Sequence, residues 1–276
     1  MTQPAGASAP TCPRHPDRVS YVRCQRCERP ACPECQRPAA VGVLCVDCLK
    51  QAQSQARPMR SRLGFTMSAG PPLATFVLIG LNVAVFLLGP VLLGDAWPGA
   101  WALWPEATPI ESAAFIDVGT EWYRWITAGF VHFGLWHIGM NMLALWQLGQ
   151  SLEPALGRWR FVGLYAGSLL GSSAAVQIIG TGGQLTAVGG ASGAIFGLLA
   201  AYGVVLKRLR LPYTSVLVIA AIFIGGPLVS ELIPGFAFFS GLSWQGHLGG
   251  AVAGAIIMLA MFRGVDRREK ATRAAT

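Results

Sequence analysis

Charged residues are scarce in this sequence: they make up 12% of its 276 residues, whereas 53% are hydrophobic. Soluble globular domains carry about 25% charged residues, so the composition excludes that class and indicates a membrane protein. Asp and Glu number 13 against 21 Lys and Arg, which gives a net charge of +8. The basic residues lie mostly at the ends of apolar segments, a pattern that favours a membrane topology signal over nucleic-acid binding.

The first fifty residues lack the apolar core of a secretory signal peptide, and we expect the N-terminus to stay in the cytosol. Cysteine is missing from the rest of the chain, because all seven cysteines lie between Cys12 and Cys48. With one histidine they form four ligand pairs, each spaced by two residues: Cys12 and His15, Cys24 and Cys27, Cys32 and Cys35, and Cys45 and Cys48.

These pairs supply enough thiol and imidazole ligands for two tetrahedral zinc sites. A disulfide framework is the less favoured alternative, because it requires an oxidising compartment and leaves one thiol over. Residues 1–50 contain too few large apolar side chains for a hydrophobic core, so bound zinc would supply the folding free energy. We therefore predict a small zinc-binding domain at residues 1–50 with two structural ions.

The ligand spacing resembles that of B-box and related cross-brace zinc fingers. The resemblance implies that one ion is bound by Cys12, His15, Cys32 and Cys35, and the other by Cys24, Cys27, Cys45 and Cys48. Pairing of consecutive ligands remains the alternative. Fingers of this kind usually bind protein partners, so we expect a protein partner for this domain and no nucleic acid.

A basic, proline-containing linker at residues 51–72 leads into six apolar segments. They cover residues 73–93, 125–149, 161–179, 189–206, 214–233 and 244–262. Each has about the 20 residues that a bilayer crossing requires. Lys and Arg gather at alternate connections, which places both termini in the cytosol. We predict a domain of six membrane spans at residues 73–262, a basic cytosolic tail at 263–276, and a multi-pass protein of the cell membrane.

Polar residues inside these spans cost free energy unless they are paired or useful. In the second span, His137 and Asn141 are four residues apart and share a helix face, whereas one continuous helix places His132 off that face. Ser192 lies near the start of the fourth span and His247 near the start of the sixth. Because these three spans all begin on the external side, we expect the side chains to meet in the outer half of the bilayer.

The surroundings of Ser192 favour close contact between helices. Three glycines lie within three residues of it, and small residues are common where membrane helices touch, so packing alone is one interpretation of this stretch. The sixth span carries Gly250 and Gly254 on the face of His247, which lets it approach another helix closely. Packing of these two spans would pair Ser192 with His247.

Such a pair suits nucleophilic catalysis. A serine hydroxyl is weakly nucleophilic until a base accepts its proton, and neutral histidine can act as that base. The Ser192 N–H and the side chains of His137 and Asn141 can stabilise a developing oxyanion. No acidic residue lies at the depth of His247, so we expect a Ser-His dyad. The soluble-hydrolase G-x-S-x-G motif is disfavoured, because Ala194 stands where it needs glycine.

Three spaced motifs resemble those of the rhomboid family of intramembrane serine proteases. They are His132-x4-His137-x3-Asn141, Gly190-Ala191-Ser192-Gly193 and His247-x2-Gly250-x3-Gly254. The match covers about residues 74–262. It implies an all-α membrane protein, a six-helix transmembrane rhomboid bundle that here follows a small N-terminal zinc-binding domain.

The resemblance also implies roles for single residues. Ser192 would be the nucleophile, His247 the general base, and His137 with Asn141 the oxyanion hole. Supporting roles fall on three others: His132 near the water-access cavity, Phe196 beneath the catalytic histidine, and the structural Glu153 after the second span. One departure is Tyr123-Arg124, because the external loop of the family usually ends in Trp-Arg.

By resemblance, the protein would cleave transmembrane proteins in or near their membrane segments, inside a lipid bilayer and without a catalytic cofactor. The active site would open to the external side. Two alternatives remain. One is a catalytically silent rhomboid-like protein that binds or escorts membrane proteins, and the other is a zinc-regulated transporter with intramembrane polar residues. Labelling by a fluorophosphonate separates a protease from the silent protein, and solute flux would identify a transporter.

Overall fold

The computed structural model describes residues 9–55, 59–67, 70–95, 97–104, 121–180, 187–233 and 241–274. The chain divides into two compact units, Met1–Pro58 and Met59–Thr276, which we call the N-terminal unit and the membrane unit. The first unit ends with α1 (Val46–Gln55), a helix that continues past residue 50 into the segment whose composition predicts a linker.

The N-terminal unit is built from short strands around its cysteines. β1 (Thr11–Cys12) pairs antiparallel with β2 (His15–Val19), and β3 (Gln36–Pro38) pairs antiparallel with β4 (Val43–Cys45). A 3-10 turn, η1 (Pro33–Cys35), precedes β3. Six of the seven cysteines are buried and form the centre of the unit. The strands are too short to give an alternating pattern, which is why sequence analysis predicts the domain without them.

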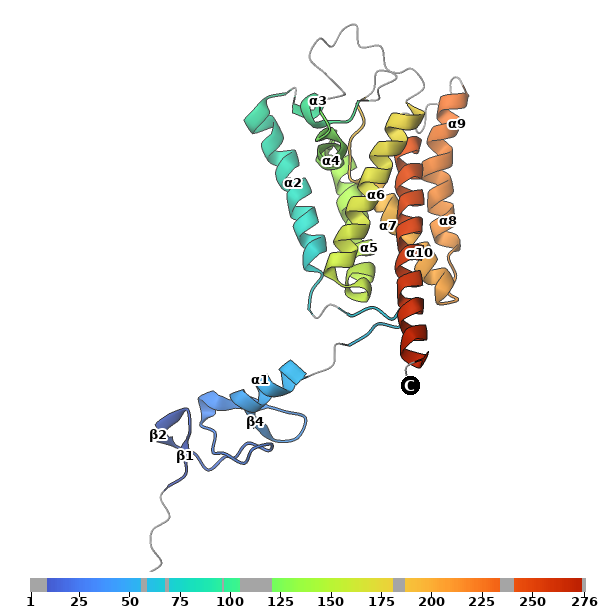
Figure 1. Ribbon diagram of the computed structural model, residues 1–276. Coiled ribbons are helices and arrows are strands. Elements are labelled where there is room, and N and C mark those ends of the chain that lie inside the picture. The colour runs from blue at the N-terminus through green and yellow to red at the C-terminus, as the bar shows by residue number, and fades with distance from the viewer. Residues whose placement is uncertain are drawn as a thin grey trace, which may run out of the picture. The chain divides into compact units, whose positions relative to one another are not determined.

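The membrane unit is a helical bundle whose long helices stand roughly side by side (Figure 1). These are α2 (Leu73–Leu93), α5 (Leu135–Leu156), α6 (Arg158–Ile179), α7 (Ser192–Arg208) and α10 (Trp244–Ala274). A further rod consists of α8 (Thr214–Ala220), the π-helix η3 (Ala221–Gly225) and α9 (Gly226–Leu232), which follow one another without a break. Two short helices, α3 (Trp97–Trp101) and α4 (Arg124–Thr127), lie towards one end of the bundle.

Four helical segments in the described part of the chain are long and apolar enough to cross a membrane: Leu73–Leu93, Arg158–Ile179, Thr214–Leu232 and Trp244–Arg267. The protein is therefore a helical membrane protein. α5 and α7, the other two predicted spans, are not among the four. α5 contains many polar side chains, and the 17 residues of α7 reach about 25 Å, less than the roughly 30 Å of a bilayer core. The count of six spans stays a prediction.

α7 packs against α5, α6 and α10, and ten of its 17 residues are buried. Gly250 and Gly254 of α10 face Gly193 and Gly197 of α7, and a Cβ at either α10 position would collide with the carbonyl group of the facing glycine. The two helices therefore touch backbone to backbone, the kind of contact that the small residues in both spans predict.

The second apolar segment is not one continuous helix, which corrects the sequence prediction. α4 leads into the 3-10 turn η2 (Ala128–Phe130), Val131 is extended, and α5 begins only at Leu135. Gly134 precedes α5 with an extended backbone. Glycine has low helix propensity, and Gly129 and Gly134 border this break. His132 consequently lies outside the helix that carries His137.

Glu153 joins α5 to the start of α2. Its fully buried carboxylate accepts hydrogen bonds from the N–H groups of Ala74 at 2.9 Å and Thr75 at 2.8 Å, and from the Thr75 hydroxyl at 2.8 Å. The first N–H groups of a helix lack intrahelical partners, and they attract negative charge. Glu153 therefore caps α2 from within the last turns of α5.

Replacing this cap should destabilise the membrane unit. In Glu153→Gln an amide NH2 replaces one acceptor oxygen and faces a backbone N–H, so we expect the free energy of unfolding to fall by about 1–3 kcal/mol. Thermal unfolding of the purified protein in detergent measures the change. Glu231→Gln is the matched control, because Glu231 is exposed and accepts one hydrogen bond from Trp244 Nε1. Equal losses in both variants would contradict the capping role.

Arg124 fastens α3 to the bundle. The side chain is 4% exposed, and its Nη1 donates to the carbonyl oxygens of Gly99 at 2.7 Å and Ala102 at 3.0 Å, while Nε donates to Glu121 at 2.7 Å. Tyr123, which stands where the rhomboid pattern usually has tryptophan, is 36% exposed. Arg124, and not Tyr123, therefore makes the buried contacts with α3 and the residue that follows it.

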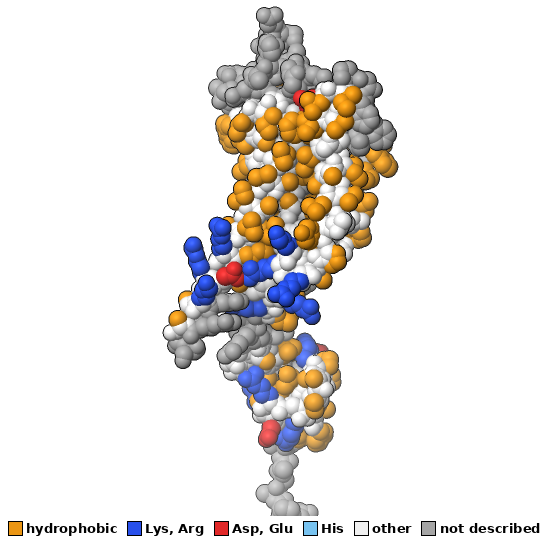
Figure 2. Space-filling view, turned by 90° about the vertical axis from the view of Figure 1, so that its right-hand side faces the viewer, with side chains coloured by type: hydrophobic (Ala, Val, Ile, Leu, Met, Phe, Trp, Pro, Cys, Tyr) orange, Lys and Arg blue, Asp and Glu red, His pale blue; other side chains and the backbone are white. Residues whose placement is uncertain are grey.

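The surface of the membrane unit is divided by polarity. Figure 2 shows hydrophobic side chains covering its flank and Lys and Arg gathered at one end. The basic residues near the α5–α6 connection, the α7–α8 connection and the last turns of α10 are Arg158, Arg160, Lys207, Arg208, Arg210, Arg263 and Arg267. An apolar flank with cations at one end is the pattern expected of a bundle that sits in a bilayer.

Candidate functional site

Ser192 is the first residue of α7, at the end of the helix away from Lys207 and Arg208. Gly190, two residues before it, has a φ of +127°, a conformation that side-chain-bearing residues rarely adopt. This turn is fixed by a hydrogen bond from the Gly190 N–H to the Ala128 carbonyl at 2.8 Å. The glycine-rich stretch thus places the serine at a helix start next to the break in the second span.

The Ser192 hydroxyl meets His247 of α10. Ser192 Oγ lies 3.0 Å from His247 Nε2, and His247 Nδ1 lies 2.8 Å from the carbonyl oxygen of Phe223. Because a carbonyl oxygen can only accept, Nδ1 is the donor in this hydrogen bond. In a neutral imidazole Nε2 is then the acceptor, so it is oriented to receive the serine proton.

The imidazole is held on its face as well as at its nitrogens. The rings of Phe196 and His247 are stacked, with centroids 4.3 Å apart and planes inclined by 15°. His247 is 4% exposed. Phe196 lies one turn after Ser192 in α7, and this places its ring beneath the histidine. Stacking and two hydrogen bonds together leave the imidazole little freedom to rotate.

His137 of α5 borders the same small space. A Cβ atom built at Gly190 would lie 2.8 Å from Cε1 and Nε2 of His137 and 3.7 Å from Ser192 Oγ. Glycine at position 190 therefore keeps this space open between the imidazole and the hydroxyl. Asn141 is buried one turn further along α5, where its Nδ2 donates to the His137 carbonyl at 2.8 Å.

His132 lies closer to this group than a continuous helix would allow. Its ring centroid is 5.0 Å from that of His137, and its Nδ1 donates to the Phe130 carbonyl at 3.2 Å. Its Nε2 is 3.5 Å from the N–H of Ala191, the residue before Ser192. His132 thus links the extended segment before α5 to the turn before α7.

The group combines a hydroxyl, an imidazole that accepts its proton, and further polar groups around one space. In the described part of the chain, Nδ1 of the central histidine bonds to a backbone carbonyl and not to a carboxylate. A neutral hydrogen-bond acceptor is suited to this buried position, because a carboxylate here would have to be desolvated. This arrangement can support acyl transfer without an acidic third residue.

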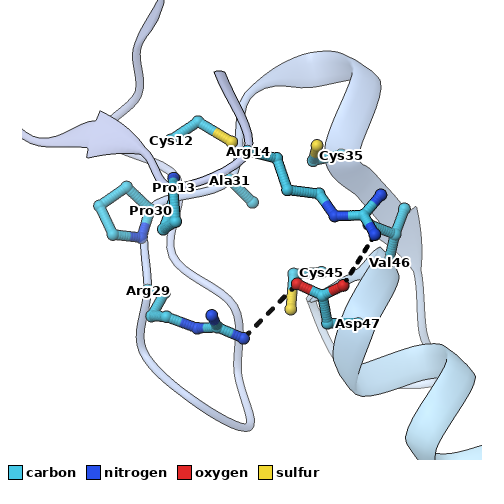
Figure 3. A pocket seen from close by; sticks show the side chains of 10 residues that line it. All are labelled: Cys12, Pro13, Arg14, Arg29, Pro30, Ala31, Cys35, Cys45, Val46 and Asp47. Carbon is cyan, nitrogen blue, oxygen red and sulfur yellow. Dashed lines mark ion pairs between the residues drawn. The ribbon is translucent and has the colours of Figure 1, made fainter. Parts of the chain in front are cut away.

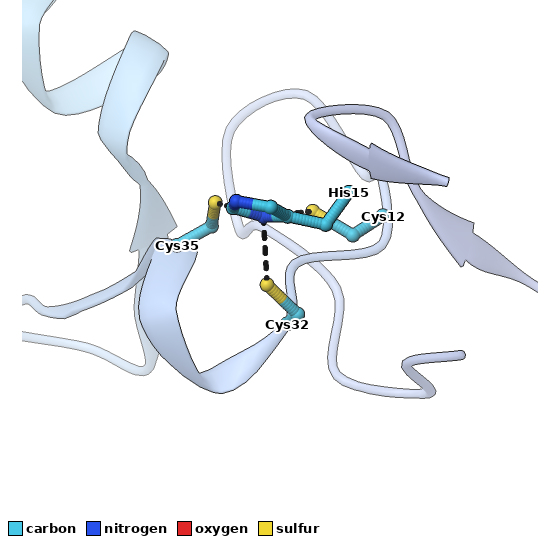
Figure 4. A group of neighbouring side chains, drawn as sticks. All are labelled: Cys12, His15, Cys32 and Cys35. Carbon is cyan, nitrogen blue, oxygen red and sulfur yellow. Dashed lines mark hydrogen bonds between the residues drawn. The ribbon is translucent and has the colours of Figure 1, made fainter. Parts of the chain in front are cut away.

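The N-terminal unit contains two groups of metal ligands. Cys12, His15, Cys32 and Cys35 form one group, and Cys24, Cys27, Cys45 and Cys48 the other, each with its ligand atoms within 4.8 Å of one another. The first group surrounds the imidazole of His15 (Figure 4). This interleaved grouping is the one that the B-box resemblance implies, and not the pairing of consecutive ligands.

The spacing within each group fits a tetrahedral ion. Zn–S bonds of about 2.3 Å put two sulfur ligands roughly 3.8 Å apart, and Cys27 Sγ and Cys45 Sγ are 3.8 Å apart. His15 Nδ1 lies 3.2 to 3.9 Å from three cysteine sulfurs. The neighbouring Cys27 thiol raises the pKa of Cys48 to about 12. A bound divalent cation favours the thiolate form of its cysteine ligands, and the thiol and imidazole donors of the two groups fit such an ion.

Ion pairs connect residues that lie beside the two ligand groups. Asp47 lies between Cys45 and Cys48, and it pairs with Arg14 at 3.1 Å and with Arg29 at 3.6 Å (Figure 3). Arg14 belongs to the turn of the first group. Glu34 lies 3.8 Å from Nε2 of His15, opposite the nitrogen that faces the cysteines. The shorter contact of Glu34 is to Arg18, at 2.6 Å.

Sequence reasoning missed two backbone features of the membrane site. The Phe223 carbonyl carries no signal in the sequence by itself, although Pro227 four residues later marks an irregular helix. The break that brings His132 to His137 is signalled by Gly129 and Gly134, which flank the histidine.

A protein family and several known proteins are similar to this chain over part of its length. The family description "Rhomboid domain" matches residues 119–264. Rhomboid protein 1, mitochondrial, of Saccharomyces cerevisiae is 29% identical over 217 residues, which cover 72% of this chain and 56% of the yeast protein. Rhomboid protease GluP of Bacillus subtilis is 32% identical over 191 residues, covering 67% of this chain and 34% of that protein.

A further relative, Rhomboid protease GlpG of Serratia proteamaculans, is 32% identical over 131 residues, which cover 48% of this chain and 42% of that protein. The chain thus spans between 34% and 56% of the length of these three relatives.

Proposed function

Because a rhomboid domain occupies residues 119–264, this protein belongs to the rhomboid family, and we propose that it is an intramembrane serine endopeptidase. Two of the relatives, GluP and GlpG, are named rhomboid proteases. The observation that carries the proposal is the hydrogen bond of 3.0 Å between Ser192 Oγ and His247 Nε2. It places a nucleophile against a base whose other nitrogen is already occupied as a donor.

In the proposed reaction Ser192 Oγ attacks the carbonyl carbon of a substrate peptide bond while His247 Nε2 takes the hydroxyl proton. The negative charge that develops on the carbonyl oxygen is stabilised by the Ser192 N–H and by the side chains of His137 and Asn141, each contributing about 10²-fold to 10³-fold in rate. His247 then gives its proton to the leaving amine nitrogen as the C–N bond breaks. Water hydrolyses the acyl-serine by the same proton relay.

The proposed substrates are transmembrane proteins, cut in or near their membrane segments. A helical substrate segment satisfies its own carbonyl groups, so it has to unwind before a serine can attack. Segments rich in glycine or other weak helix formers unwind at the least cost. The cations at one end of the bundle support a cytosolic position for that end. Ser192, at the opposite end of α7, would then be reached from the external side of the cell membrane.

For the N-terminal unit we propose two structural zinc ions and a protein partner. The interleaved ligand groups and the tetrahedral spacing of their atoms support zinc. The ions would supply folding free energy to this unit and take no part in peptide cleavage.

A fluorophosphonate probe tests the proposal directly. We expect the probe to label the full chain in detergent at Ser192, because its phosphorus traps a serine that a base has activated. His247→Ala should lower the labelling rate by about 10²-fold to 10⁴-fold, since the general base is gone. Mass spectrometry of the labelled peptide identifies the site. A chain that binds transmembrane proteins but resists labelling would instead be a catalytically silent escort.

A further inference from the structure

We infer that Pro227, in the first turn of α9, is a positioning residue that sets the proton position on His247. The inference rests on the proposed function, because the ring that it positions is the proposed general base. Pro227 does not contact the reacting atoms. It acts through the backbone carbonyl of Phe223, the acceptor for His247 Nδ1 at 2.8 Å.

Pro227 leaves a gap in the hydrogen-bond pattern of its helix. In a regular α-helix the carbonyl of residue 223 accepts from the N–H of residue 227. Proline has no N–H, so Pro227 cannot supply this hydrogen bond. The Phe223 carbonyl therefore lacks its usual α-helical donor, and His247 Nδ1 donates to it at 2.8 Å.

The effect of Pro227 is also steric. The ring of a proline inside a helix collides with the carbonyl of the residue four positions earlier and pushes it aside. Here that carbonyl belongs to Phe223. The helix responds by widening: residues Ala221–Gly225 form the π-helix η3, and α-type bonding resumes where the Gly226 N–H donates to the Ile222 carbonyl. Single π-turns of this kind often accompany functional sites.

The rod that contains Pro227 also lies beside the imidazole of His247. Pro227 is buried, so its ring is held by the protein and not free in lipid. The Phe223 ring lies 6.2 Å from the ring of Phe196, which stacks on His247. The rod of α8, η3 and α9 therefore contacts His247 directly, through the carbonyl oxygen of Phe223. It also contacts the histidine indirectly, because the Phe223 ring lies near the Phe196 ring that stacks on His247.

Together these features explain how the site orients its base without an acidic residue. An aspartate in this place would bring a charge that has to be desolvated, whereas a carbonyl freed by proline is neutral and already part of the backbone. In the sequence, Gly225-Gly226-Pro227 indicates only a weak point in a helix. The structure gives the proline a specific acceptor, four residues back, in contact with the proposed base.

The variant Pro227→Ala tests this role in the full chain, reconstituted in liposomes with a transmembrane substrate. Alanine restores an N–H that competes with His247 for the Phe223 carbonyl. We expect kcat to fall by about 10-fold to 100-fold, less than the whole contribution of a general base, and KM to change by less than about twofold. Pro90→Ala in α2 is the matched control, because Pro90 also lies inside a membrane helix. It should leave kcat unchanged.

A spectroscopic measurement tests the proton position itself. Nitrogen-15 NMR of histidine-labelled wild-type protein, with the His247 signals identified by their loss in His247→Ala, should show neutral His247 protonated at Nδ1. In Pro227→Ala a second population protonated at Nε2 should appear. Because the wild-type spectrum is informative alone, a variant that fails to fold does not end the test.

The outcomes separate the inference from the proposed function. Absence of cleavage and labelling in the wild type would reject the protease, while the NMR spectrum would still report on the contact. Wild-type His247 protonated at Nε2 would overturn the inference. An active enzyme whose kcat and histidine spectrum are both unchanged in Pro227→Ala would overturn it as well.

Discussion

Replacing Ser192 with alanine is expected to lower the rate of cleavage by about 10⁴-fold or more. The change removes the oxygen that lies 3.0 Å from His247 Nε2 and attacks the substrate carbonyl in the proposed mechanism. Loss of one hydroxyl at a helix start should leave the bundle folded. The measurement is cleavage of a transmembrane substrate in liposomes, with thermal unfolding of the same preparation.

Ser168→Ala is the matched control for this prediction. Ser168 is fully buried in α6, and its hydroxyl donates to the Leu164 carbonyl at 2.7 Å, so it bonds to its own helix and not to the site. We expect its kcat to stay within about threefold of the wild type. Cleavage that persists in Ser192→Ala would reject the assignment of the nucleophile, whatever the control shows.

Removal of metal should unfold the N-terminal unit while the membrane unit keeps its helices. We expect two zinc ions per full-length chain by elemental analysis. A chelator should then make residues 9–55 sensitive to protease, because structural zinc contributes on the order of 10 kcal/mol to small domains of this kind. The buried cysteines form the centre of the unit, so little else would hold it together.

A single ligand variant sharpens this test. Cys32→Ala removes one buried ligand of the first group and should lower the zinc content to one ion per chain or less. Tyr21→Ala, at a side chain that is 78% exposed, is the control and should keep two ions. Well under two zinc ions in the wild-type protein would contradict the two-site assignment.

Hydrophobic pattern predicted much of the fold, because uninterrupted apolar runs report membrane helices directly. The first span matches α2 from Leu73 to Leu93, and the prediction of a helical rhomboid bundle is confirmed by the match at residues 119–264. The break before α5 escaped prediction, because a segment with Val131 and Phe133 is as apolar as a helix would be. Hydropathy reports burial in lipid, and not the path of the backbone.

The candidate site was likewise predicted only in part from the sequence. The shared external start of the fourth and sixth spans and their small-residue faces predicted that Ser192 and His247 meet, and in the structure Ser192 Oγ lies 3.0 Å from His247 Nε2. The partner of Nδ1 could not be predicted, because every residue has a carbonyl and only the local helix geometry decides which one is free. Glu153 was predicted as structural, but its contact with the start of α2 joins residues 78 positions apart, which one sequence cannot show.

The helices that carry the proposed chemistry, α5 and α7, are also the two predicted spans that fall short of the length or hydropathy of a membrane-crossing helix. Because α10 follows α7 in the chain, the glycine faces of these two helices can meet only after α10 has emerged during biosynthesis. The proposed nucleophile therefore meets its proposed base only once α10 has packed against α7.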